Sequence, residues 1–131
     1  MKQPKITTLL FRGLTRRCPA CGSRKIFTNW AKIKHNCPKC NFHFERIEGH
    51  WVGAIGINTI LTFATLLISL IVGLVITFPE FPTTKLIIIN TVVALTSSIF
   101  YFPISKTLWT AIDIAMRPIQ EEEFQTTSEE L

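Results

Sequence analysis

The sequence predicts a small membrane protein: an N-terminal four-cysteine zinc ribbon of short β-hairpins, then a two-helix transmembrane hairpin and a short interfacial helix. Two Cys-x-x-Cys pairs near the N-terminus are separated by fifteen residues, a spacing typical of structural zinc sites. Residues 52–78 contain no charged side chain, and residues 84–107 contain two lysines as their only charges. At 131 residues the chain has room for one ordinary domain at most, and this composition favours membrane spans over a globular core.

The four cysteines are arranged as two matched turns. A proline follows the first cysteine of each pair, and Gly22 and Asn41 follow the second. Glycine and asparagine tolerate a positive φ most readily, so both turns are expected to close in the same way. Four thiolates complete a tetrahedral shell, which predicts a closed structural site and no catalytic residue. The predicted metal ligands are Cys18, Cys21, Cys37 and Cys40.

Zinc is the predicted metal, and a rubredoxin-like iron site is the alternative, because ligand softness and geometry alone do not separate the two. Disulfides are not expected, since the chain shows no secretory signal and the cysteines are expected to face the cytosol. The three histidines are not expected to be ligands, because the cysteines already saturate the site. Nearby cations are expected to offset the thiolate charge: Arg16, Arg17, Arg24, Lys25 and Lys39.

Residues 1–17 form a basic leader, for which a short interfacial helix and a disordered segment are both open. Apolar side chains recur in it at helical spacing among basic residues, as in helices that lie on anionic lipid. These apolar residues are Ile6, Leu9, Leu10 and Leu14.

Residues 18–46 are expected to form the ribbon. Residues 25–28 and 30–35 are rich in β-branched and aromatic side chains, and residues 42–45 alternate apolar with polar, so short strands are expected. A unit this small buries too little surface to fold alone, and the metal is expected to supply the missing free energy. Its aromatic residues are interpreted as a small core, with nucleic-acid stacking as the alternative: Phe27, Trp30, Phe42 and Phe44.

Residues 47–51 are the predicted linker to the membrane, with Trp51 as an interface anchor. Gly49 and Gly53 are expected to let the chain turn there. Glu48 and His50 are interpreted as a polar collar at the entrance of the helix, and a proton-handling pair is the alternative. Asn58 is expected to hydrogen-bond a neighbouring helix, and a ligand role is the alternative.

Residues 52–78 and 84–107 are the two predicted transmembrane helices, since about twenty apolar residues suffice to cross a bilayer. Ser69 and Gly73 have the small-xxx-small spacing that lets helices approach closely. Pro103 is expected to end or kink the second span.

Beyond the spans, residues 108–119 are predicted to form an interfacial helix in which Asp113 and Arg117 can pair. Residues 120–131 are predicted to be an acidic disordered tail. Eleven of the fourteen Lys and Arg residues precede the first span, so the positive-inside rule places both termini in the cytoplasm. The predicted location is therefore the bacterial cell membrane, crossed twice.

This ordered run of motifs resembles the bacterial family known as domain of unknown function 983, over about residues 12–118. The run consists of Arg-Cys-Pro-Ala-Cys-Gly at residues 17–22, Ile-Phe at 26–27, Cys-Pro-Lys-Cys at 37–40, a glycine collar and two spans. Residues 48–58 and Tyr-Phe-Pro-Ile-Ser at 101–105, with Arg117-Pro118, look like the actinobacterial branch, and the Asp-Gly-Pro-type collar of other branches is missing. The resemblance implies a small zinc-ribbon membrane protein without an assigned activity, some members being encoded near respiratory-oxidase genes.

The expected function is that of a membrane-anchored interaction or assembly protein, which presents its metal module to a membrane partner such as a respiratory complex. Delivery of zinc or another ion to a membrane acceptor is the first alternative, and nucleic-acid binding by the basic ribbon is the second. An enzyme is not expected, because the chain lacks paired catalytic groups, and a homodimer is compatible with the small-residue hairpin.

Overall fold

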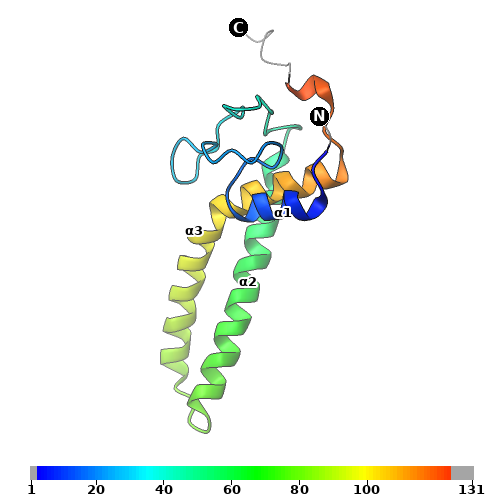
Figure 1. Cartoon of the computed structure of the whole chain (residues 1–131). Coiled ribbons are helices and arrows are strands. Elements are labelled where there is room, and N and C mark those ends of the chain that lie inside the picture. The colour runs from blue at the N-terminus through cyan, green and yellow to red at the C-terminus, as the bar shows by residue number, and fades with distance from the viewer. Residues whose placement is uncertain (1–2, 125–131) are drawn as a thin grey trace.

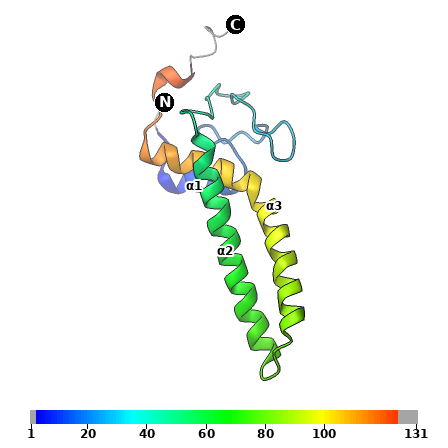
Figure 2. The same ribbon diagram turned by 180° about the vertical axis from the view of Figure 1, so that it is seen from behind.

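The structure, a computed structural model, describes residues 3–124 as three α-helices and one short 3-10 helix. Helix α1 is Ile6–Leu14, α2 is His50–Thr77, α3 is Thr83–Met116, and the 3-10 helix η1 is Glu121–Phe124. Helices α2 and α3 form a long hairpin, and the remainder of the chain gathers at its open end (Figure 1). Seen from behind, the same end carries α1 and residues 15–49, which we call the cysteine module (Figure 2).

Helices α2 and α3 are both long and apolar enough to cross a membrane. Their most apolar 18-residue windows are only 0% and 6% buried, so their large aliphatic side chains face outward along most of the hairpin. The turn between them contains Pro79 and Pro82, which lack a backbone N–H and restrict the preceding residue, so neither helix can run through it.

The predicted second span and the predicted interfacial helix belong to one bent helix, α3. This helix continues through Pro103 and then turns across the open end of the hairpin (Figure 1). A proline removes one backbone hydrogen bond and crowds the preceding turn, which bends a helix without necessarily ending it. All the buried side chains of α3 come from Pro103 onward, so the bent end is the part of this helix that packs against the protein.

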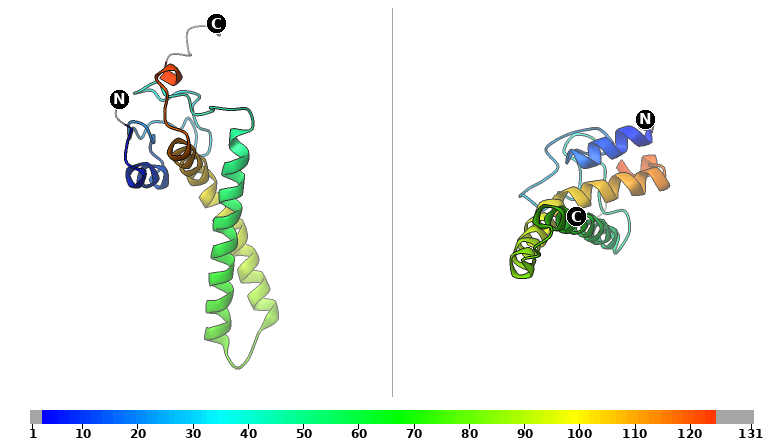
Figure 3. Two further views of the ribbon diagram at one scale, coloured as in Figure 1. Left: turned by 90° about the vertical axis from the view of Figure 1, so that its right-hand side faces the viewer. Right: turned by 90° about the horizontal axis from the view of Figure 1, so that it is seen from below.

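The leader contains helix α1, which packs alongside the bent end of α3 (Figure 3, right). Leu9 and Gly13 are buried on the side that faces α3. A Cβ on Gly13 would lie 3.0 Å from the Cβ of Ala111, and the Thr107 hydroxyl donates to the Gly13 carbonyl at 2.6 Å. Glycine therefore permits the close approach of the two helices. Of the other apolar side chains of α1, Leu10 is half-buried, and three stay exposed: Ile6, Phe11 and Leu14.

The short strands expected in the ribbon are not seen. Within residues 3–124 no strand is formed, and the only β pairing consists of two isolated antiparallel bridges, Phe27 with Ile33 and Asn36 with His43. Between the two cysteine turns, single backbone bonds remain, such as Lys34 N–H to Ile26 C=O and Thr28 N–H to Lys32 C=O. These bonds do not continue into the regular ladder that defines paired strands.

The core of the cysteine module is shared with the helices. Phe42 and Phe44 are fully buried and pack edge to face with 5.9 Å between their ring centres. Both therefore belong to a small core, as predicted. Trp30, in contrast, is 49% exposed and is not part of this core. The buried apolar cluster combines residues of the module, α1 and α3: Leu9, Cys18, Ile26, Cys37, Phe42, Phe44, Ala111 and Ile114.

The segment predicted to be a disordered tail begins with η1, which contacts the cysteine module. The ring centres of Phe124 and Phe42 are 5.9 Å apart, and the Phe124 carbonyl accepts a hydrogen bond from Asn41 Nδ2 at 3.2 Å. The rest of the predicted tail, residues 125–131, lies outside the described residues.

Candidate metal centre and its attachment to the helices

The four predicted ligand cysteines come together at one point. Their Sγ atoms all lie within 4.8 Å of one another, with 3.9 Å between Cys18 and Cys40 and 3.6 Å between Cys21 and Cys37. A tetrahedral centre with a metal–sulfur distance of about 2.3 Å requires sulfur–sulfur separations of about 3.8 Å. All four cysteines are free, and a disulfide would bring two sulfurs to about 2.05 Å. The spacing of the thiols therefore fits a single metal ion, without distinguishing zinc from iron.

The two cysteine turns have the same backbone hydrogen bonds. Cys18 N–H donates to the Ser23 carbonyl at 2.8 Å, and Cys37 N–H donates to the Phe42 carbonyl at 3.0 Å. In each turn the residue after the second cysteine donates back to the first, Gly22 at 2.8 Å and Asn41 at 2.9 Å. Gly22 has a φ of 79° and Asn41 a φ of 59°, which confirms the expected positive φ at both positions. The internal repeat in the sequence is thus a repeat of structure.

Burial opposes negative charge on the thiols. It raises the pKa of Cys40 to about 12, and it also raises the pKa of Cys18. At Cys37 burial acts in the same direction, but the pKa is lowered overall because the N–H groups of Cys40 and Lys39, together with neighbouring thiols, stabilise the thiolate. A divalent cation held by these four cysteines would supply the attraction that lets four thiolates coexist, and its binding would release their protons.

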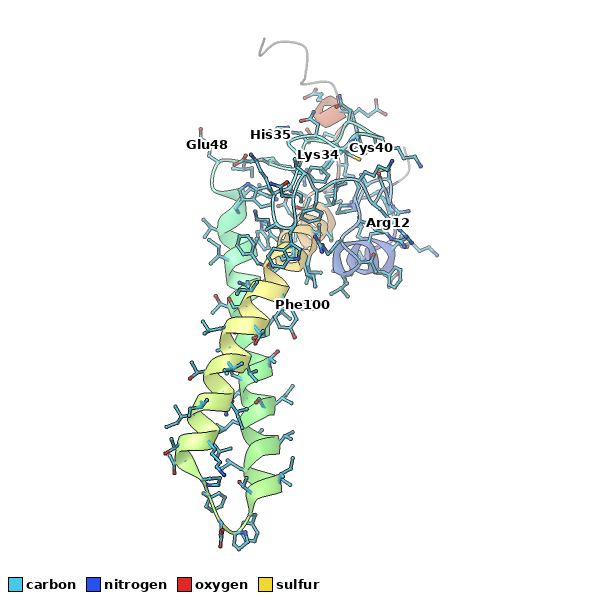
Figure 4. All side chains as sticks on the ribbon, turned by 90° about the vertical axis from the view of Figure 1, so that its left-hand side faces the viewer. Arg12, Lys34, His35, Cys40, Glu48 and Phe100 are labelled. Carbon is cyan, nitrogen blue, oxygen red and sulfur yellow. The ribbon has the colours of Figure 1, made fainter. Side chains whose placement is uncertain are left out.

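Helix α1 supports the first cysteine turn through Arg12. Its Nη1 donates to the carbonyls of Pro19 and Ala20, both at 3.1 Å, and a Cβ on Gly22 would lie 3.2 Å from its Nε. Figure 4 shows Arg12 above α1, on the side of the cysteine module. The sequence shows Arg12 only as one basic residue of the leader, and this contact could not be predicted from it because the contact depends on how α1 packs.

Arg16, which is expected to offset thiolate charge, also supports the loop between the two turns. Its Nη2 donates to the Trp30 carbonyl at 2.7 Å, and its guanidinium lies 4.7 Å from the centre of the Phe27 ring. This contact is a cation–π interaction on the outer side of the core.

A buried ion pair joins the cysteine module to α3. Arg46 Nη1 lies 3.0 Å from Asp113 Oδ2, both side chains are 7% exposed, and the same nitrogen donates to the Arg117 carbonyl at 3.0 Å. The expected pair of Asp113 with Arg117 was wrong: among the described residues, Asp113 pairs with Arg46. A buried carboxylate requires a well-placed cation, and the bend of α3 brings Asp113 to the module rather than to solvent.

The start of α2 is packed against the bent end of α3. Gly49 has a φ of 77° and directs the chain into the helix, as expected. Gly53, expected to serve a turn, instead lies inside α2 beneath the Trp109 indole, where a Cβ would approach Cε2 to 2.1 Å. Its role is to leave room for that ring.

The polar residues near the joint do not form one site. His50 is 6% exposed, with its Nε2 3.4 Å from Thr110 Oγ1, whereas Glu48 is exposed and extends away at the start of α2 (Figure 4). Asn58 Nδ2 donates to Ser98 Oγ on α3 at 3.4 Å, which confirms the expected bond to a neighbouring helix. Among the described residues, the metal-competent cluster consists of the four cysteines without a histidine.

Together these features define a class: an apolar helical hairpin whose open end carries a module with four clustered cysteines that could hold a metal ion. The chain belongs to the family described as Protein of unknown function (DUF983), which it matches over residues 27–113. The match includes the second cysteine turn, α2 and α3 as far as Asp113, and begins after the first turn. The comparisons with curated proteins and with solved structures find no match.

Proposed function

We propose that this chain is a membrane-anchored docking protein that holds a metal-stapled module at the cytoplasmic face of the bacterial cell membrane. The observation that carries the proposal is the rigid attachment of the module. Its core continues into α1 and α3, and a buried ion pair links it to α3. A module fixed in this way presents the same surface at the same height above the bilayer, which suits the docking of a membrane partner.

The membrane location is supported by the exposure of the hairpin. A core helix of a soluble protein would be mostly covered, but the most apolar windows of α2 and α3 are 0% and 6% buried. Such a continuous apolar surface needs lipid or another protein around it. Most of the basic residues lie at the module end, so the positive-inside rule favours a cytoplasmic module and two cytoplasmic termini.

The metal centre supports a structural role rather than metal delivery. Cys18 and Cys37 are 0% and 2% exposed, so an acceptor could not reach half of the ligand set without local unfolding. Zinc in such a closed shell would stabilise the fold. Analysis of protein purified without added metal tests this directly: one zinc per chain is expected, and iron would replace zinc in the proposal.

The surface available to a partner includes apolar side chains on the outside of the cysteine module. Trp30 is 49% exposed and Ile47 is 48% exposed, in a segment that also carries exposed lysines. Tryptophan is enriched at protein interfaces, so Trp30 is the best single candidate for an anchor. The resemblance to a family encoded partly near respiratory-oxidase genes makes a respiratory membrane complex, or its assembly machinery, the partner to test first.

The test is affinity purification of the full chain from gently solubilised membranes, compared with two variants. We expect Trp30→Ala to lose most of the co-purifying partner while it keeps its metal. Lys25→Ala, which changes another exposed side chain of the module, should retain the partner. Absence of any membrane protein above background, or equal recovery with Trp30→Ala and wild type, would contradict docking through this surface.

A further inference from the structure

A second site lies where the cysteine module meets the hairpin. A cavity of about 170 Å³ opens there, with walls from the module, from the first turn of α2 and from the bend of α3. This volume is below the roughly 300 Å³ at which pockets for drug-sized ligands begin, so the cavity suits a small chemical group. Apolar atoms form most of its surface, and its lining residues are Lys32, Ile33, Lys34, His35, Phe44, Glu45, Trp51 and Lys106.

The charge of this cavity is positive. Three lysines face one glutamate, which leaves a net charge of +2 with His35 neutral (3 − 1 = 2). Among the described residues, neither Lys32 nor Lys34 has a carboxylate within 4.0 Å, since the ion pair found there is that of Arg46 with Asp113. Figure 4 shows Lys34 in the module at the end of the hairpin. A concave site with unpaired ammonium groups is suited to an anion.

Lys106 is held in place at the helical wall of the cavity. Its Nζ donates to the Ala31 carbonyl at 3.1 Å and lies 5.3 Å from the Trp51 ring centre and 4.7 Å from that of Phe102. The carbonyl and the two rings fix the ammonium without neutralising it, because none of them carries a formal charge. This lysine therefore offers a preorganised positive group, and an ammonium has three N–H donors.

The position of the cavity indicates where its anion comes from. Trp51 lies in the first turn of α2 and Lys106 lies just past Pro103 on α3, so the cavity floor is at the level where the bare apolar surface of the hairpin begins. If the hairpin spans the membrane as proposed above, this level is that of the lipid headgroups. Basic pockets at the cytoplasmic ends of transmembrane helices are suited to anionic lipid headgroups.

We propose that this cavity binds the phosphate group of an anionic phospholipid, with Lys32, Lys34 and Lys106 as its ligands and the acyl chains lying along the exposed hairpin. The inference rests on the proposed membrane location. A soluble phosphate would use the same ligands, and the experiment below distinguishes the two sources.

The test uses the full, metal-loaded chain released from nanodiscs that contain phosphatidylglycerol and phosphatidylcholine in equal amounts, with bound lipids counted by native mass spectrometry. We expect wild type to retain phosphatidylglycerol selectively, and Lys32→Gln/Lys34→Gln to lower that selectivity about tenfold or more, since each lysine near a membrane surface contributes about 1 kcal/mol. The matched control is Lys25→Gln/Lys39→Gln, which removes two exposed charges of the module outside the cavity lining. Equal loss in both variants would overturn a specific site.

Two further measurements complete the test. Saturable binding of inorganic phosphate to wild type in phosphatidylcholine nanodiscs, seen by phosphorus NMR and lost in Lys32→Gln/Lys34→Gln, would overturn a lipid source in favour of a soluble one. Flotation of the chain with membranes, resistant to alkaline wash, checks the proposed location independently. A chain that floats without selecting phosphatidylglycerol refutes the lipid site alone, whereas a chain that does not float refutes the membrane location as well.

Discussion

Replacing Gly53 by alanine tests the packing that joins α2 to the bent end of α3. A Cβ at this position would lie 2.1, 2.3 and 2.4 Å from three atoms of the Trp109 indole. Carbon atoms in contact normally lie about 3.5–4.0 Å apart, so the ring would have to move by more than 1 Å. Trp109 is packed near His50, with 6.3 Å between ring centres, which limits that movement.

The expected size of the effect follows from two opposing terms. Alanine is favoured over glycine in a helix interior by about 1 kcal/mol, whereas overpacking a close contact costs about 1–3 kcal/mol. Because several indole atoms are affected, we expect the upper end of that range and a net destabilisation of about 1–2 kcal/mol. The matched control is Gly56→Ala in the same helix, where nothing lies within 4 Å of the new Cβ, so it should be neutral or slightly stabilising.

The assay is thermal unfolding of both variants in detergent, followed by tryptophan fluorescence and circular dichroism. We expect Gly53→Ala to unfold at a lower temperature than Gly56→Ala, and the deficit to shrink when Trp109→Leu is added. If Gly53→Ala were at least as stable as Gly56→Ala, the indole would not lie on this glycine, and the described joint between α2 and α3 would be wrong.

Three further predictions concern the ion pair, the second cysteine turn and the metal. Arg46→Met should destabilise the fold by about 3–5 kcal/mol because it strands the buried carboxylate of Asp113, and Arg46→Met/Asp113→Leu should recover much of that loss in chemical denaturation. Asn41→Ala should be less stable than Asn41→Gly by about 1–2 kcal/mol in thermal unfolding. Both variants lose the contacts of the Asn41 amide, but only alanine is strained at a φ of 59°. Metal removal by a strong chelator should expose all four cysteines to a thiol reagent while far-ultraviolet circular dichroism keeps most of the α2 and α3 signal; thiols that stayed protected without metal would contradict the proposed centre.

The features predicted well from the sequence are those that depend on residues close to one another in the chain. Each cysteine turn closes through backbone bonds that span at most five positions, so the Cys-x-x-Cys spacing with Gly22 or Asn41 after it is enough to specify the turn. The two long helices follow from uninterrupted apolar composition, and their connecting turn follows from its prolines. The predicted strands are not formed. Alternation of apolar and polar residues also fits an irregular loop in which buried and exposed positions alternate, so this pattern alone does not specify a strand.

The sequence by itself determined the two matched cysteine turns, the two long apolar helices and the position of the bend at Pro103, because these depend on composition and on bonds between near neighbours. Only the tertiary structure decided how the module is held. Its contacts join residues far apart in the chain, such as Arg46 with Asp113 and Thr107 with Gly13. Which residues meet depends on the direction in which the bent end of α3 crosses the hairpin, and that direction is set by packing among all the elements at once.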